Sequence, residues 1–371
     1  MEYGKNVIWA YDLLVKDDQL ALWDIATILR EYGVVNVSKG NLIFSFMAGL
    51  LLFVGMLWYF GFERFLFNLS RVSLTWLIMS ISTLVVVHVF RVLRWRRLLV
   101  PVKESLRFST FFWATAVGFM ANILIPVRIG EPLRAGLVSK KERIGFFESL
   151  SSVGVERLLD LSCLLLLSMV GLFSFPAQTS LPEWFSNSLR ITGAVTSFIF
   201  AVLILSLKKE EFVLNTLERL LSFVPIIGRF KSRILSAAMS LIRGARGLDY
   251  GLRPLLIIII QTGCLWLTQF LGFYLIFKAF NLELPAATLL IANILLLLSS
   301  ALPAPPGYVG TQEAIWLLIF RGLGIKELDL LLTIGVTWHI IGILSTILLG
   351  SLGIAWLGLS FKEIFKATQP K

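Results

Sequence analysis

The sequence has few of the residues on which disulfide-rich domains and metal sites depend. Only two cysteines and two histidines occur among its 371 residues. Cys163 and Cys264 both lie inside apolar runs, where a free cysteine behaves as a small buried hydrophobic side chain. Neither a disulfide framework nor a zinc-ligand spacing can be built from them. We therefore expect no metal and no cofactor.

Catalytic signatures are also missing from the sequence. It has no GxxxxGK loop for ATP, no nucleophile elbow and no cluster of histidines with carboxylates. These absences favour a protein without chemistry of its own. The carboxylates Glu131, Glu156 and Asp160 keep an alternative open, because an intramembrane transferase or hydrolase could use them as acids and bases.

The sequence does contain many hydrophobic residues, arranged in long apolar runs. Hydrophobic residues make up 57% of the chain and the mean hydropathy is +0.83, which soluble domains rarely reach. Several runs are long enough to cross a bilayer, for which about 20 apolar residues suffice. The net charge of +11 comes from basic residues between these runs, so it indicates topology signals and contacts with acidic lipids rather than nucleic acid.

The apolar runs predict six full membrane spans. They lie near residues 43–61, 73–91, 158–176, 191–207, 254–278 and 330–358. The basic stretches 91–107 and 208–253 then fall in the cytoplasm, together with both termini. No cleavable signal peptide is visible.

The predicted organisation is one transmembrane domain with short flanks. We expect an interfacial N-terminal segment at 1–42, the domain at 43–360 and a cytoplasmic tail at 361–371. Within the domain, 208–250 is basic and intermittently apolar, which is typical of amphipathic helices on the membrane surface. This loop either anchors the topology or gathers lipid headgroups.

Two further apolar runs are broken by proline and glycine. The first extends over Phe111–Val138 and the second over Ala287–Phe320. Irregular backbone at membrane depth is tolerated only within protein or beside a wet cavity, so paired breaks indicate a transport site. The breaking residues are Pro126, Gly130, Pro303, Pro305, Pro306, Gly307 and Gly310.

The charge pattern predicts that these two hairpins enter the membrane from opposite sides, as an inverted pair. The alternative is that each hairpin arm crosses fully. The predicted fold class is therefore an all-α polytopic membrane protein with about six full helices and two re-entrant hairpins, or eight or more membrane segments.

The first hairpin concentrates charge that is costly inside a membrane. Glu131 and Arg134 are three residues apart on a helix and are expected to pair. Arg128 lies in the break itself, where a guanidinium either holds a phosphate in a bidentate manner or extends to the cytoplasmic interface.

A second charged group opens the third span. Glu156 and Asp160 are one helical turn apart and share a face, and Arg157 is three residues from Asp160. We expect the two carboxylates to pair with Arg128 or Arg134. The plainer interpretation is a solvated start to a membrane helix.

The second hairpin carries a single acid. Thr311 is expected to cap the helix that restarts there, with Glu313 at its second position. Capping alone accounts for Glu313, and an anion site at this helix start is the alternative. His339 is either a hydrogen-bonded packing residue or a proton carrier. Gln261, Thr262 and Gln269 either line a polar path or bond between helices.

Three strings give the chain a recognisable pattern. They are NILIPVRIGEPLRAGLVSKKE at 122–142, ESLSSVGVERLLDL at 148–161 and LPAPPGYVGTQEA at 302–314. Together they resemble the lysylphosphatidylglycerol-synthase transmembrane-region family, also called the flippase-like domain family. The resemblance implies the following charged positions for lipid translocation: Arg128, Glu131, Arg134, Glu156, Arg157, Asp160 and Glu313.

The resemblance also implies a function. It predicts a multi-pass protein of the cell membrane that moves an anionic lipid between leaflets, either a phospholipid or a polyprenyl-phosphate-linked lipid. Family members resemble the flippase half of the multiple peptide resistance factor or accompany glycosyltransferases. A separate glycosyltransferase or lipid synthase is thus an expected partner, and an accessory role beside such an enzyme is the remaining alternative. Pairing into a homo-oligomer also fits.

Overall fold

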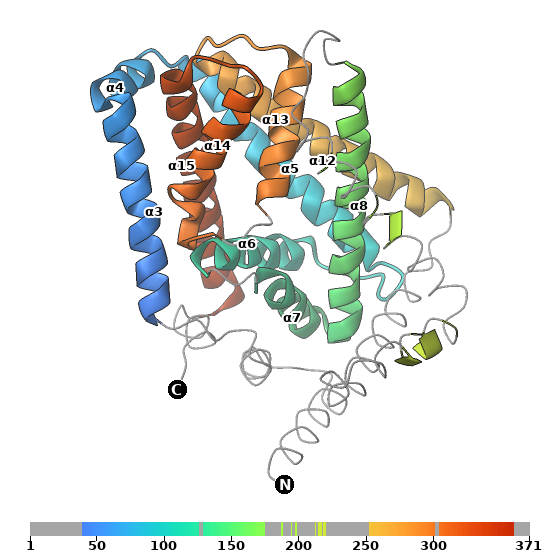
Figure 1. Ribbon diagram of the computed structural model, residues 1–371. Helices are drawn as coiled ribbons and strands as arrows, with labels where there is room; N and C mark the ends of the chain where they lie inside the picture. The colour runs from blue at the N-terminus through green and yellow to red at the C-terminus, as the bar shows by residue number, and fades with distance from the viewer. Residues whose placement is uncertain are drawn as a thin grey trace.

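The structure is a computed structural model that describes residues 39–125, 129–174, 252–300 and 304–359, with isolated positions between 187 and 219. Every regular element in these ranges is helical (Figure 1), which confirms the predicted all-α class. Most of the predicted N-terminal segment, most of the span at 191–207, most of the loop at 208–250 and the tail lie outside the described residues.

The helices are named as in Figure 1. The first group comprises α3 (Lys39–Phe60), α4 (Phe62–Ser70), α5 (Leu74–Leu98), α6 (Phe108–Leu124), α7 (Gly130–Glu142) and α8 (Phe146–Phe173). The second comprises α12 (Leu252–Ala279), α13 (Ala286–Ser299), the short 3₁₀ helix η2 (Pro306–Tyr308), α14 (Thr311–Gly322) and α15 (Leu328–Leu357).

Three of the described helices are long and apolar enough to cross a membrane, namely α5, α12 and α15. A fourth span is possible if α3 and α4, which meet at an angle of 80°, are counted together. This establishes a helical membrane protein. The full count of eight segments stays a prediction.

Two helices extend beyond the predicted membrane spans. The second span was expected to end near Arg91, but α5 continues to Leu98. Arginine has a high helix propensity, and the side chain of Arg94 is buried among partners from other helices. The third span was expected near 158–176, after a helical approach from Phe146, and α8 is indeed one helix from Phe146 that includes the charged approach.

The helices α5 and α12 form the central antiparallel pair. Each successive contact joins a later residue of one helix to an earlier residue of the other. Three hydrogen bonds define the pairing: Ser73 N–H to the Ala279 carbonyl (2.8 Å), Ser80 Oγ to the Gly272 carbonyl (2.8 Å) and Arg94 Nη1 to Thr262 Oγ1 (3.3 Å).

The order of elements repeats around this pair. The helix α5 is followed by the short helices α6 and α7 and then by the long α8. In the same way, α12 is followed by α13 and α14 and then by α15. Because α5 and α12 are antiparallel, the two hairpins start from opposite ends of the pair (Figure 1).

Each closing helix crosses to the other set. The helix α15 packs along α6, and α8 packs against α13, in addition to their contacts with their own hairpins. The tip of the second hairpin, η2, also contacts α6. The two broken hairpins therefore meet within one packed body.

Packing between the helices depends on small residues as well as on aromatic rings. Gly272 lies where α5 crosses α12, and a Cβ added there would collide with Thr83 Oγ1 and approach Trp338. In a membrane, close backbone approach of this kind replaces the hydrophobic driving force. Large apolar side chains such as Trp58 and Phe173 are exposed on the outside, as a lipid-facing surface requires.

This crossing generates the first prediction. Gly272→Ala should lower the free energy of unfolding by about 1–3 kcal/mol, because the added methyl group overpacks the α5–α12 contact. Gly263, on the same helix, has no atom within 4 Å of an added Cβ. Gly263→Ala is therefore the matched control and should be neutral or slightly stabilising. Thermal unfolding in detergent measures both, and equal losses in the two variants would contradict the close approach.

Candidate functional site

An asparagine side chain links the two helices on either side of the first break. The side-chain oxygen of Asn122, near the end of α6, accepts the N–H of Gly130 at 2.7 Å, and its amide nitrogen donates to Glu131 Oε2 at 3.0 Å. A Cβ at Gly130 would collide with the carbonyl of Gly118, so only glycine permits this approach. Pro126 and Arg128 lie outside the described residues.

Five charged side chains from three helices meet beside this break. Glu156 accepts a bidentate pair from Arg134, with both N–O distances at 3.2 Å. This confirms the predicted pairing of an α8 carboxylate with the hairpin. The predicted Glu131–Arg134 pair is wrong, because Arg134 turns to Glu156 while Glu131 bonds Asn122.

Arg94 from α5 completes the network. Its Nη1 donates to Asp160 Oδ1 at 2.7 Å, and its Nη2 lies 3.4 Å from Glu156 Oε1. Arg157 bridges the same two carboxylates, at 3.3 Å to Glu156 and 3.5 Å to Asp160. The side chains of Arg94 and Glu156 are fully buried, whereas that of Arg157 is 41% exposed. The plainer interpretation of a solvated helix start is therefore wrong.

Aromatic side chains fix the orientation of these groups. The indole N–H of Trp266 on α12 donates to Asp160 at 3.1 Å, and that of Trp95 donates to Ser152 Oγ at 2.9 Å. The Arg134 guanidinium lies 4.5 Å from the Trp95 ring centroid. Such cation–π contacts are strongest when the cation is desolvated.

The cluster carries more positive than negative charge. Arg91 lies one turn before Arg94 on α5, and its guanidinium is 4.6 Å from the Phe119 ring centroid, with no carboxylate within 4 Å in the described ranges. Four arginines thus face two carboxylates, an excess of two charges that falls to one if Glu131 is included. The Nε groups of Arg94, Arg134 and Arg157 are buried and bond no other described residue. The arrangement can accept an anion.

Sequence reasoning missed Arg91 and Arg94. Both were assigned to a cytoplasmic loop by the rule that basic residues flank spans. Two signals were available: the arginines follow the apolar run without a break, and they are three residues apart, which places them on one helix face.

The second break is built from left-handed backbone. Gly307, Tyr308 and Gly310 have φ values of 68°, 57° and 77°, and Pro305 and Pro306 precede them. Two of the three positions are glycine, which adopts this region without strain. A Cβ at Gly310 would collide with the backbone of Gly49 on α3, so α3 lies directly against the break.

Glu313 joins this break to α15. Its Oε2 accepts the N–H of Gly310 at 2.8 Å, and its Oε1 lies 2.5 Å from Nδ1 of His339. The predicted cap was wrong by one residue: Gly310 is the N-cap, and Glu313 is the third residue of α14. Thr311 Oγ1 instead donates to the Tyr308 carbonyl. His339 is a hydrogen-bonded packing residue, and its proton role stays a prediction.

The chain was compared with known families and proteins. The family described as "Lysylphosphatidylglycerol synthase TM region" matches residues 46–350. The chain belongs to this family. A curated relative, a UPF0104 membrane protein of Methanothermobacter thermautotrophicus, is 26% identical over 295 residues, covering 76% of this chain and 84% of that protein. No solved structure matches.

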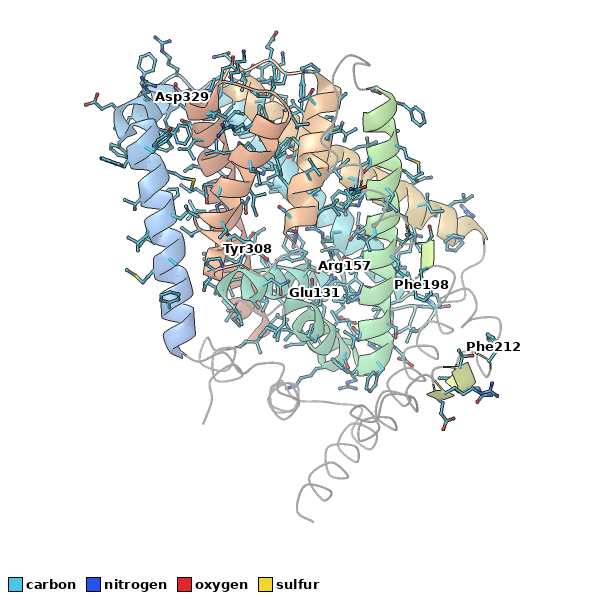
Figure 2. All side chains as sticks on the ribbon, viewed as in Figure 1. Glu131, Arg157, Phe198, Phe212, Tyr308 and Asp329 are labelled. Atoms are coloured by element: carbon cyan, nitrogen blue, oxygen red, sulfur yellow. The ribbon has the colours of Figure 1, made fainter. Side chains whose placement is uncertain are left out.

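The lysylphosphatidylglycerol synthase TM region spans both breaks and every residue of the arginine cluster. The predicted family is thus confirmed. Figure 2 shows Glu131 and Arg157 in the part of this region where α7 meets α8.

The network within this family member generates the second prediction. Arg94→Met should lower the free energy of unfolding by about 3 kcal/mol, because it removes the fully buried cation that pairs with both Asp160 and Glu156. The double variant Arg94→Met with Asp160→Leu should lose less than the sum of the two single variants. A double-mutant cycle by chemical unfolding in detergent tests this, and additive losses would contradict the pairing.

The second break generates the third prediction. Glu313→Leu should destabilise the protein by about 1–3 kcal/mol, because the buried N–H of Gly310 and the His339 ring lose their acceptor. Glu313→Gln keeps one oxygen and should lose less. Glu63→Leu on α4, which has no buried residue, is the control and should be near neutral. Thermal unfolding checks the order, and an equal loss for Glu313→Leu and Glu63→Leu would exclude the capping role.

Proposed function

We propose that the protein is a lipid flippase that moves an anionic lipid between the two leaflets of the cell membrane. The observation that carries this proposal is the excess of arginine over carboxylate beside the first break. The family description, which refers to the synthase of a phospholipid, supports a lipid-related role.

The arginines divide into two roles. Arg94 and Arg134 are committed to carboxylates and hold α5, α7 and α8 together. Among the described residues no carboxylate lies within 4 Å of Arg91, and Arg157 is partly exposed, so these two are the groups that a phosphate oxygen engages. Guanidinium groups suit this task because they bind phosphate in a bidentate manner and are always charged.

The position of the hairpins supports a path across the membrane. They start from opposite ends of the α5–α12 pair, and the tip of the second contacts α6 of the first. In this proposal they enter from opposite sides as an inverted pair within eight or more membrane segments, with both termini cytoplasmic. The headgroup moves between the tips while the acyl or prenyl tails stay in lipid.

A basic pocket provides an entrance at the foot of the first hairpin. It has a volume of about 730 Å³. Its lining brings together four basic residues and one acid: Lys103, Arg107, Lys141, Arg143 and Glu142. A concave surface of one sign raises the local concentration of anionic headgroups.

The geometry disfavours chemistry at the same site. Glu156 and Asp160 each contact two or more arginines, so both carboxylates are already engaged in ion pairs. We therefore infer transport without a covalent step, driven by a gradient or by consumption of the lipid on one side.

The fourth prediction tests transport. When full-length protein is present in liposomes, a fluorescent phosphatidylglycerol should become inaccessible to an impermeant quencher more quickly. Arg91→Gln and Arg157→Gln should each slow this by roughly tenfold, the loss expected for one charge-assisted hydrogen bond.

The control for this assay is Arg64→Gln, which removes an exposed charge on α4 far along the chain from the cluster. It should flip lipid as the wild type does. Absence of acceleration by the wild type with phosphatidylglycerol and with phosphatidic acid would refute the proposed function. Equal rates for all three variants would refute the role of the arginines.

A further inference from the structure

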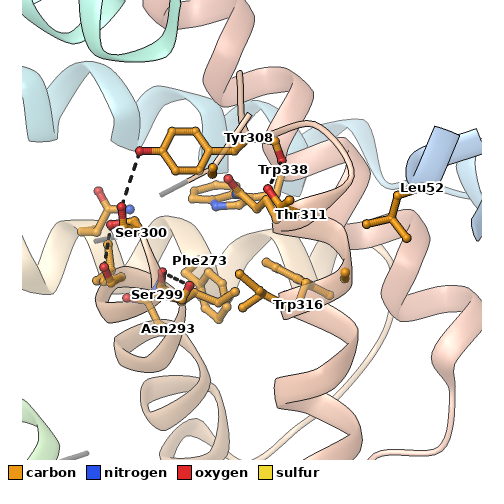
Figure 3. A pocket seen from close by; sticks show the side chains of 16 residues that line it. Leu52, Phe273, Asn293, Ser299, Ser300, Tyr308, Thr311, Trp316 and Trp338 are labelled. Carbon is orange, nitrogen blue, oxygen red and sulfur yellow. Dashed lines mark hydrogen bonds between the residues drawn. The ribbon is translucent and has the colours of Figure 1, made fainter. Parts of the chain in front are cut away.

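A second cavity, free of charge, lies beneath the second hairpin. It has a volume of about 350 Å³ and is bounded by α12, α13, α14 and α15, with Leu52 of α3 at its edge (Figure 3). None of its 16 lining residues is charged. It is therefore chemically unlike the arginine cluster beside the first hairpin.

The amide side chains in this cavity have no hydrogen-bond partner among the described residues. Asn293 is only 6% exposed, yet its side chain bonds no other residue in the described ranges. The half-buried side chains of Gln269 and Gln312 also form no hydrogen bond with a described residue. Buried polar groups normally have a partner, so these donors and acceptors are available to a ligand.

The hydroxyl groups around the cavity behave differently. Ser299, Ser300 and Thr311 each donate to a backbone carbonyl of a nearby residue in the chain (Figure 3). They are satisfied within the protein. The free hydrogen-bonding capacity of the cavity therefore resides in the three amides.

Aromatic rings and aliphatic side chains supply the remaining walls. Phe273, Trp316, Trp338 and Tyr308 line the cavity together (Figure 3). Flat aromatic faces accept the C–H faces of a ring, while amides bond its hydroxyl groups on both sides as donor and acceptor. This combination suits an uncharged ring that carries hydroxyl groups rather than a phosphate.

The volume limits the size of the ligand. Ligand pockets usually measure about 300–1,000 Å³, and this one is near the lower end. It accommodates one ring, not an extended oligosaccharide. The cavity rim includes Tyr308 of η2, the element that contacts the first hairpin.

We propose that this cavity binds the uncharged polyol or sugar ring of a lipid headgroup. The assignment rests on the proposed function and narrows its substrate to a lipid that carries both a phosphate and such a ring. In this proposal Asn293 and Gln269 bond the ring hydroxyls.

Equilibrium binding to the purified full-length protein in detergent tests this. The probes are phosphatidylinositol and phosphatidic acid with identical tails, which differ in the presence of the ring. Phosphatidylinositol should bind about tenfold more tightly, the gain expected from one or two net hydrogen bonds, although phosphatidic acid has the more exposed phosphate.

Two cavity variants and one control complete the experiment. Asn293→Leu and Gln269→Leu should reduce the preference for phosphatidylinositol to about twofold or less, with the affinity for phosphatidic acid unchanged, which shows that the variants are folded. Gln261→Leu is the matched control, because Gln261 lies on α12 like Gln269 but does not line the cavity. It should keep the wild-type preference.

The outcomes separate the two proposals. Equal affinity for the two lipids in the wild type, or a preference that survives both cavity variants, would overturn the ring site even if the protein flips lipid. A preference that depends on Asn293 would support the ring site even if flipping fails. Free myo-inositol that binds as tightly as phosphatidylinositol, with the same sensitivity to Asn293→Leu, would assign the cavity to a soluble polyol and overturn the lipid headgroup.

Discussion

The buried network around Arg94 is the interaction on which the rest of the structure depends. It joins α5 to Asp160 and Glu156 of α8, reaches α7 through Arg134 and reaches α12 through Trp266. Four helices from both halves of the sequence are thereby fixed around one group of charges. Buried charges are costly unless they are paired. Other packings of these helices would leave the charges unpaired, so the network favours this one.

Much of the fold followed from local patterns. The apolar runs and the proline and glycine breaks predicted where helices begin and end, and a one-turn spacing predicted that Glu156 and Asp160 share a face. The partner of those carboxylates could not be found in this way. Arg94 is 66 residues from Asp160 in the sequence, and a rule based on local charge assigned it to a loop.

The same limit applies to the second hairpin. Glu313 was expected at a helix start from its neighbours alone, and the break does place it there. Its contact with His339 depends on how α14 lies against α15, and the open amide of Asn293 depends on four helices at once. A leucine-rich run with one asparagine carries no signal of a cavity. The two hairpins thus share a shape but differ in chemistry, one cationic and one neutral.

The exchange of closing helices between the two sets has a mechanical consequence. Because α15 lies along α6 and α8 lies against α13, the two halves are interlocked and cannot part as separate rigid bodies. A displacement of either hairpin pushes on the long helix that belongs to the other. The two hairpins are thereby coupled to each other through α8 and α15.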